Sequence, residues 1–289
     1  MELELLDSIL PSLRQNSTVI TGPGDDCAVV EFNGGKLLLA VDQVTENIHF
    51  TSQTAPERAG AKLVKRNLSD IAAMGGYPLW MMLAVSNGSR DMEWVKRFVS
   101  GAEKAAELFD VPIVGGDTSS LPAEGFTASI SIIGCADLPV LRSGAKPGDL
   151  IYVTGKIGNS FHSKHHLDFI PHLAEGKALS GTAHAMMDVS DGLLLDAERM
   201  AKASKADFYL DLDNIPLRQG AVMPQALGDG EDYCLLFTCA PDTDIEKLFT
   251  DSNLQSTPVM IGRVEAGNGT LYDLKSGSRI NMENSGYEH

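Results

Sequence analysis

The sequence predicts an α/β fold built as two domains, and three observations carry this prediction. Segments with helical spacing of apolar residues alternate with short apolar runs typical of strands, which favours helices layered on sheets. The chain has 289 residues, enough for one large domain or two ordinary ones. The segment "DLPVLRSGAKPGD", residues 137–149, interrupts the pattern with two prolines and two glycines. We therefore predict a boundary near residue 138, with domains over 1–137 and 138–289.

The first half carries most of the expected elements. Leucines recur at helical spacing within residues 3–14, which are predicted to be helical. The runs "CAVVEF" and "KLLLAV" predict two strands joined by the turn "NGG". Pro56 near the start and two glycines at the end bound a helix predicted over 56–76. The other expected elements are a buried strand over 79–86, an amphipathic helix over 91–109, and strands over 111–116 and 126–136.

The second half restarts with a strand over 150–155, "LIYVTG". A helix is predicted to follow the motif "DVSDG", from about 192 to 204. Three further apolar runs predict strands, namely "FYLDL" at 208–212, "DYCLLFT" at 232–238 and "TPVMIGRV" at 257–264.

Composition excludes several classes of protein. The formal net charge is -16, which argues against a nucleic-acid partner. No apolar run reaches the roughly 18 residues that span a bilayer, and the acidic start is unlike a secretory signal, so no membrane association is expected. The four cysteines, Cys27, Cys135, Cys234 and Cys239, show no CxxC spacing. We interpret them as reduced core residues of a cytoplasmic protein.

The informative feature is where the aspartates fall. Most lie beside a glycine or at the end of an apolar strand, the places where open α/β folds build sites. The positions are Asp25, Asp26, Asp42, Asp70, Asp117, Asp188 and Asp191. Any single one is explained as well by a helix cap or a turn. Carboxylates that converge would repel one another unless a cation joins them. Magnesium prefers oxygen ligands and is shared between carboxylates and substrate phosphates, so the pattern predicts a magnesium-phosphate site.

Other motifs were weighed against this hypothesis. The chain has no GxxxxGK[ST] P-loop and no GxGxxG fingerprint. Arg142, at the predicted boundary, could hold a phosphate bidentately. Lys65 and Arg66 are interpreted as surface charges of a helix. The run "FHSKHH" at 161–166 offers three histidines, but a polar loop is favoured over a zinc site because no cysteine or acid pair is spaced to complete one.

Seven segments, taken together, resemble one known family. They are "GPGDDCAVV", "VDQVTENIHF", "NLSDIAAMGGYP", "VGGDTS", "RSGAKPGDLIYVTG", "DVSDGLLLD" and "GEDYCLLFT". Their order and approximate spacing are similar to those of the bacterial thiamine-monophosphate kinases, from about residue 2 to the C-terminus. The resemblance implies the two-domain fold of the aminoimidazole ribonucleotide synthetase superfamily, an α/β domain followed by an α+β domain. It also implies a homodimer in which N-terminal strands of two chains form a dimeric barrel, with ATP bound near that interface.

The implied activity is ATP-dependent phosphorylation of thiamine monophosphate to thiamine diphosphate, by direct transfer assisted by several magnesium ions. No general base is needed, because the acceptor phosphate oxygen is already ionised at neutral pH. Carried over motif by motif, the implied magnesium ligands are Asp26, Asp42, Asp70, Asp117, Asp188 and Asp191. Of these, Asp26, Asp42, Asp70, Asp117 and Asp191 are the implied catalytic residues. The implied ATP contacts are Phe109, Gly116, Asp117, Arg142 and Ser190, and the implied thiamine-side contacts are His49 and Glu231.

The chain departs from the family pattern at several places in its substrate half. Ala40 and Val41 stand where the family usually has Ser or Thr before the "VD" aspartate, so one hydroxyl ligand is missing. The segment 159–172 is shorter by about 20 residues than the family pattern, a change of loop length that folds often tolerate. The remaining departures are His172 for the usual Arg, Cys234 for a Glu, and Asn284 for an aromatic residue.

Two other kinds of function remain open at this stage. A related synthetase of the same superfamily would share the ATP chemistry with a different acceptor. Selenophosphate synthetase and the hydrogenase maturation relative are disfavoured, because the chain lacks the former's reactive N-terminal cysteine and the latter's cysteine tail. A non-catalytic nucleotide or metal sensor derived from the kinase is the alternative from another class. An assay of thiamine diphosphate formation separates it from a working enzyme.

Overall fold

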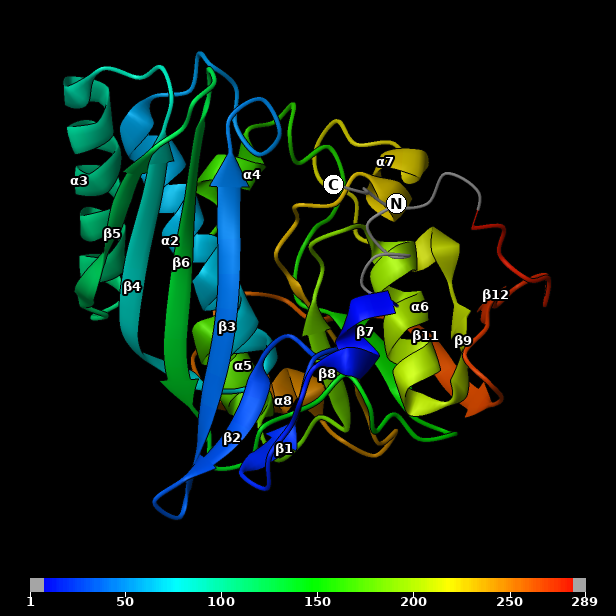
Figure 1. The fold of residues 1–289 in the computed structure, drawn as a ribbon. Coiled ribbons are helices and arrows are strands. Elements are labelled where there is room, and N and C mark those ends of the chain that lie inside the picture. Colours follow the sequence, from blue (N-terminus) through cyan, green and yellow to red (C-terminus); the bar gives the residue numbers. More distant parts are fainter. Residues whose placement is uncertain (1–7, 283–289) are drawn as a thin grey trace.

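The computed structural model describes residues 8–282. It contains two six-stranded sheets, one formed by each half of the chain (Figure 1). The elements of the first half are η1 Leu10–Ser12, β1 Val19–Thr21, β2 Ala28–Phe32, β3 Gly35–Thr45, α2 Pro56–Ala73, β4 Tyr77–Asn87, α3 Met92–Leu108, β5 Ile113–Ser120 and β6 Phe126–Cys135. Those of the second are β7 Leu150–Val153, α4 His165–Asp168, α5 Leu173–Leu179, β8 Ala185–Asp188, α6 Leu193–Ser204, β9 Ala206–Leu210, η2 Leu212–Asn214, α7 Met223–Gly228, β10 Leu235–Cys239, α8 Ile245–Asp251, β11 Val259–Ala266 and β12 Leu271–Asp273.

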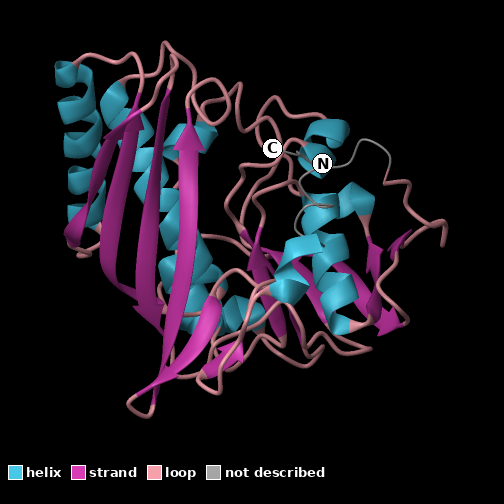
Figure 2. Cartoon of the chain, in the orientation of Figure 1, coloured by secondary structure: helices cyan, strands magenta, loops and turns pink. Residues whose placement is uncertain are grey.

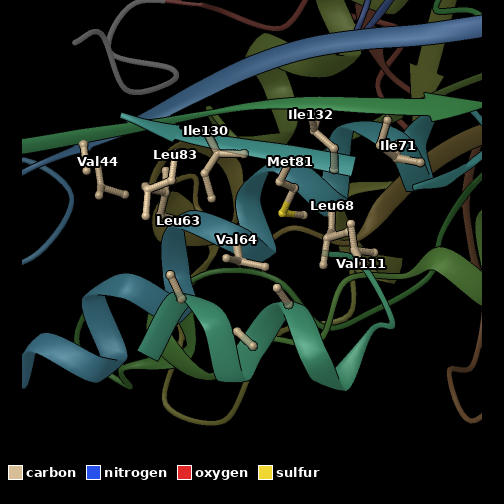
Figure 3. Packing of buried hydrophobic residues seen from close by; sticks show 14 of the residues in the cluster. Val44, Leu63, Val64, Leu68, Ile71, Met81, Leu83, Val111, Ile130 and Ile132 are labelled. Carbon is tan, nitrogen blue, oxygen red and sulfur yellow. The ribbon is translucent and has the colours of Figure 1, made fainter. Parts of the chain in front are cut away.

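The first sheet has the strand order β1-β2-β3-β6-β4-β5. All of its neighbours are antiparallel except β4 and β5, which run parallel because α3 connects them. One face of the sheet is covered by α2 and α3 (Figures 1 and 2). Side chains of that face and of α2 point toward one another in the core, as Leu68, Met81 and Ile132 illustrate (Figure 3). The strict alternation along β6, buried and half-buried in turn, follows from this one-sided cover.

Helices α2 and α3 cross at backbone contact distance, and two glycines make this possible. A Cβ atom at Gly60 would lie 2.0 Å from the Phe98 carbonyl oxygen. A Cβ atom at Gly101 would lie 2.2 Å from the Glu57 carbonyl oxygen. Both distances are far below van der Waals contact, so neither position can hold a side chain without moving a helix. The crossing therefore fixes α2 in place on the sheet.

The opposite face of the first sheet carries exposed apolar side chains, and no helix within residues 8–282 covers it. Val41 is 66% exposed, Val114 60%, Trp80 46% and Met82 44%. The expectation that residues 79–86 form a buried strand is therefore wrong for a single chain: Met81, Leu83 and Val85 are buried, while the residues between them are not. A continuous apolar run can mark a strand whose second face is buried only when another molecule packs against it.

The second sheet has the order β12-β9-β11-β7-β10-β8, and only β12 and β9 are parallel. Helix α6 packs against β8 and β9 of this sheet. Helix α2 contacts α4, α5 and β8, so it lies between the two halves of the chain. The strands and helices predicted from periodicity are present with boundaries shifted by a few residues, while β1, β8, β12 and four short helices were not foreseen.

Two predictions concern the termini and membranes. Of the helix predicted over residues 3–14, residues 3–7 lie outside the described part of the chain; residues 8 and 9 are helical, the 3-10 turn Leu10–Ser12 follows, and residues 13 and 14 are not helical. Asn284 also lies outside the described residues. Within residues 8–282, no helix combines the length and the apolar character that a bilayer crossing requires.

Candidate active site

Three aspartates from separate parts of the chain meet between the two sheets. Asp26 lies in the loop before β2, Asp70 in the last turn of α2, and Asp188 at the end of β8. Each offers one carboxylate oxygen, and these oxygens lie within 4.8 Å of one another. We call this group the carboxylate cluster. The sequence analysis predicted all three positions, and the fold brings them together although 162 residues separate the first from the last.

The carboxylate cluster is electrostatically unfavourable by itself. Burial, reinforced by the charge of Asp42, raises the pKa of Asp70 well above its usual range. Burial, reinforced by Asp26, does the same to the pKa of Asp188, although the Ser69 hydroxyl donates a hydrogen bond of 2.5 Å to its Oδ2. A divalent cation would relieve both effects, because it offsets the repulsion between the carboxylates. The donor set contains only oxygen, which fits magnesium and does not fit the softer transition metals.

Three arginines pair with aspartates around the carboxylate cluster. Arg142 donates to both carboxylate oxygens of Asp26, with Nη2–Oδ1 at 2.8 Å and Nε–Oδ2 at 3.3 Å. Arg66 donates to both oxygens of Asp42, with Nε–Oδ2 at 2.9 Å and Nη2–Oδ1 at 3.3 Å. Arg199 donates to Asp191 and to Asp196. A cavity of about 250 Å³ is lined by the carboxylate cluster, Val41, Asp42, Arg66, Arg142, Ser190, Asp191 and Tyr233. Both carboxylates and guanidinium groups therefore line this cavity.

Two aspartates, the half-buried Asp25 and the buried Asp196, hold the loops of this cavity. Asp25 accepts hydrogen bonds from the backbone N–H of Arg142, at 3.2 and 3.1 Å, so it ties the N-terminal loop to the segment that joins the two halves. Asp196 is fully buried and accepts from the backbone N–H groups of Ser190 and Asp191, each at 3.0 Å. Asp25 therefore binds a backbone N–H group, whereas its neighbour Asp26 belongs to the carboxylate cluster.

Helix α2 presents a row of polar side chains to the site. Lys62, Arg66 and Asp70 are four residues apart, so they lie on one face of the helix. At a rise of about 1.5 Å per residue, neighbours in the row are separated by about 6 Å along the helix axis. Each member of the row has its own partner. Lys62 contacts Glu231, Arg66 contacts Asp42, and Asp70 belongs to the carboxylate cluster.

The two predicted thiamine-side residues meet at Lys62. The buried Nζ of Lys62 donates to the His49 carbonyl oxygen and to Glu231 Oε1 at 2.7 Å and Oε2 at 2.6 Å, and it lies 3.0 Å from His166 Nδ1. Burial would raise the pKa of Glu231, but the hydrogen bond with His166 and the charge of Lys62 outweigh it and lower the value to about 2. Burial lowers the pKa of Lys62 to about 8, which still leaves it charged at neutral pH. The carboxylate of Glu231 is therefore ionised and fixed.

A cavity of about 400 Å³ opens beside Glu231. Its lining is Asn47, Ile48, Phe161, His162, Gln225, Asp229, Gly230 and Glu231. Phe161 comes from the shortened segment and stacks on His166 with ring centroids 4.3 Å apart. Among residues 8–282 the histidines of this segment belong to no group of three potential metal ligands.

Three predicted ATP residues lie away from the carboxylate cluster in a single chain. Gly116 and Asp117 are on β5, the edge strand, three strand positions and about 14 Å from β3. Asp117 aligns with Ala84 and, through β6, with Gln43, so its side chain points to the uncovered face of the sheet, opposite to Asp42. Phe109 ends α3 and packs against the core of the first half.

Several site residues were not predicted as such. Lys62 carries no local motif that separates it from an ordinary helix charge, and Asp196, although it ends the quoted motif "DVSDGLLLD", was not singled out as a site residue. Arg66 was interpreted as a surface charge, but its side chain is only 8% exposed and faces the cavity. Helical spacing could have indicated this, because Arg66 is four residues before the predicted ligand Asp70 and shares its face.

Comparison with known proteins supports the motif resemblance. Residues 24–136 match the family model described as AIR synthase related protein, N-terminal domain, and residues 141–273 match the corresponding C-terminal domain. The thiamine-monophosphate kinase of Aquifex aeolicus is 32% identical, with 100% of this chain and 97% of that protein covered. That of Buchnera aphidicola subsp. Schizaphis graminum is 31% identical, with 96% and 94% covered. The solved structure of AaThiL complexed with AMPPCP and TMP superposes with a TM-score of 0.86 at 30% identity, covering 100% of this chain and 96% of that one.

Proposed function

Because this chain belongs to the AIR synthase related family, and within it to the thiamine-monophosphate kinases, we propose that it transfers the γ-phosphoryl group of ATP to the phosphate of thiamine monophosphate. The product is thiamine diphosphate. The observation that carries the proposal is the carboxylate cluster beside Arg142 and Ser190, which come from four separated motifs of the sequence. A similar chain has been solved with AMPPCP and TMP, an ATP analogue and the acceptor.

The chain's own groups suit a reaction between two anions. Asp26, Asp70 and Asp188 would hold magnesium, which would supply charge neutralisation to the phosphates of both substrates. Arg142 and Arg66 present guanidinium groups to the same cavity, where each could hold a phosphate oxygen. Ser190, with its backbone N–H held by Asp196, positions the loop that faces the phosphates. Phosphoryl transfer depends mainly on such positioning and electrostatic stabilisation, so no protein nucleophile is required.

We assign the organic part of the acceptor to the cavity beside Glu231. Thiamine monophosphate carries a cationic thiazolium ring, and both Asp229 and Glu231 border this cavity. Phe161 offers an aromatic ring that is 43% exposed, and such a ring can stack on a planar heterocycle. His49 reaches the same region through its contact with Lys62. The acceptor phosphate would then extend along α2 toward the carboxylate cluster.

We further propose that the enzyme is a homodimer whose two N-terminal sheets close a barrel. The uncovered apolar face of the first sheet, with Val41, Trp80, Met82 and Val114, supports this proposal. The exposed edge strand β5 carries Gly116 and Asp117, which a single chain leaves remote from the carboxylate cluster. Their predicted roles toward ATP, and that of Phe109, depend on this dimer. The domain boundary near residue 138 and a cytoplasmic location also remain proposals.

The function is tested with purified protein, ATP, magnesium and thiamine monophosphate, by measuring thiamine diphosphate directly. Formation of the diphosphate that depends on all three additions supports the proposal. A protein that binds ATP but yields no diphosphate would instead be the non-catalytic sensor, the alternative suggested by the changes at His172 and Cys234. The dimer is tested separately by light scattering, in which Met82→Asp should yield monomers. A wild-type protein that is monomeric at micromolar concentration would contradict the dimer.

A further inference from the structure

Arg66 is the cation nearest to Asp42. Its side chain is 8% exposed, and it engages both oxygens of that carboxylate while its Nη1 donates to the Gln43 carbonyl oxygen at 3.0 Å. A planar guanidinium in bidentate contact with a carboxylate is a strong and geometrically fixed pair. Asp42 therefore already has a permanent counter-ion.

Asp42 also stands outside the carboxylate cluster, although it lines the same cavity. Among the described residues, the carboxylates whose oxygens lie within 4.8 Å of one another are Asp26, Asp70 and Asp188, and Asp42 is not in this group. The residues before it, Ala40 and Val41, offer no hydroxyl oxygen. Magnesium prefers several oxygen ligands, and at Asp42 it would compete with Arg66 for both carboxylate oxygens.

Asp26 shows that an arginine pair alone does not exclude a carboxylate from the carboxylate cluster. Asp26 is paired with Arg142 as closely as Asp42 is with Arg66, yet one of its oxygens still lies beside Asp70 and Asp188. What sets Asp42 apart is the combination of the bidentate pair, its place outside the carboxylate cluster and its apolar predecessors.

We propose that Arg66 is a fixed cation of the active site that takes the place of a metal ion at Asp42, so that Asp42 is not a magnesium ligand in this chain. Arg66 and Asp42 line both the cavity of the carboxylate cluster and a neighbouring cavity of about 560 Å³ that contains His49. Arg66 thus lies where the metal side and the acceptor side meet. The N–H groups of Arg66 that are not already paired would be available to the phosphates of the two substrates.

The proposal rests on the proposed function only in that phosphates enter this cavity, and its test requires no turnover. The number of Mn²⁺ ions bound per chain is measured by electron paramagnetic resonance titration, with and without AMPPCP. Asp42→Asn should bind as many ions as the wild type, whereas Asp188→Asn, the positive control, should bind one fewer. A gain-of-site variant, Arg66→Met, should bind one more, because it frees the Asp42 carboxylate.

The matched control is Lys65→Met, which removes a neighbouring lysine of the same helix and should leave the wild-type number. Loss of one ion in Asp42→Asn would overturn the proposal, as would an unchanged number in a folded Arg66→Met variant. If thermal melting shows that this variant does not fold, the count for Asp42→Asn decides alone. Failure to make thiamine diphosphate would overturn the proposed function alone. The number of Mn²⁺ ions bound per chain would still test the role of Arg66, because its measurement requires no turnover.

Discussion

Replacing Lys62 by Met tests the part of the site that joins the two halves of the chain. The substitution keeps the length of the side chain and removes the buried ammonium group. It leaves the Glu231 carboxylate and the His49 carbonyl oxygen without their shared donor. Because Glu231 and His166 belong to the second half of the chain, the change also weakens the contact of α2 with that half.

The expected loss of stability follows from burial. Removing one partner of a buried ion pair costs about 3–5 kcal/mol, because the other charge remains without compensation. The Glu231 side chain is 16% exposed, so water can partly replace the lysine and the lower end, about 3 kcal/mol, is expected. For a chain of this size, about 3 kcal/mol corresponds to a decrease of roughly 6–12 °C in Tm. Adding Glu231→Gln should recover part of this loss, because it removes the isolated charge.

Kinetics separate a positioning role from a purely structural one. With Glu231 no longer fixed, KM for thiamine monophosphate should rise about tenfold, roughly 1.4 kcal/mol, while KM for ATP stays within about twofold. Lys65→Met is the matched control, since Lys65 lies on the same helix but contacts the Leu167 carbonyl oxygen and the Phe169 ring. Equal changes in both KM values, or an unchanged Tm, would refute the reasoning.

Three further predictions concern the carboxylate cluster, the arginine beside it and pH. Asp188→Asn should leave stability without magnesium level or higher, because a like-charge contact is relieved, but should lower turnover at least about 100-fold; a destabilised yet active variant in melting and turnover assays would contradict this. Arg142→Lys should weaken ATP binding by about 1–3 kcal/mol in calorimetry, because a point charge cannot replace a bidentate fork; unchanged affinity would remove Arg142 from the nucleotide site. Burial lowers the pKa of His165 to about 4, so the unfolded chain takes up its proton near pH 6.5 and the folded one does not. Stability should therefore fall as pH drops from 6.5 to 4, and a His165→Gln variant with an equally steep decline in thermal melts would rule this group out as a cause.

Sequence periodicity predicted the main elements because their cause is local. Helices α2, α3 and α6 each bury one apolar face, and strands β2, β3, β4 and β6 show matching apolar runs. The short strand β8, "AMMD", was missed because four buried residues are indistinguishable from any apolar loop segment. Its position in the second sheet is decided by pairing with β10, a contact between distant parts of the chain.

The candidate site was predicted in part for a similar reason. Motif identity indicated Asp26, Asp70 and Asp188, which the structure brings together. It could not distinguish the role of Asp25, whose carboxylate binds backbone more than 100 residues away. Nor could it show that Arg66 turns inward, because only the packing of α2 between two sheets makes that face an interior one. Pairing between remote residues is decided by the tertiary structure, and one sequence contains no record of it.

The row of Lys62, Arg66 and Asp70 on α2 sets a fixed distance between the two ends of the site. The helix is held by the crossing at Gly60 and Gly101, so the separation between the acceptor end and the metal end of the row is set by backbone geometry and not by adaptable side chains. An acceptor with one methylene more or fewer between ring and phosphate would seat its ring at Glu231 and present its phosphate off the reacting position. Discrimination between acceptors of different length would thus come from helix α2, which holds the two ends of the site at a fixed distance.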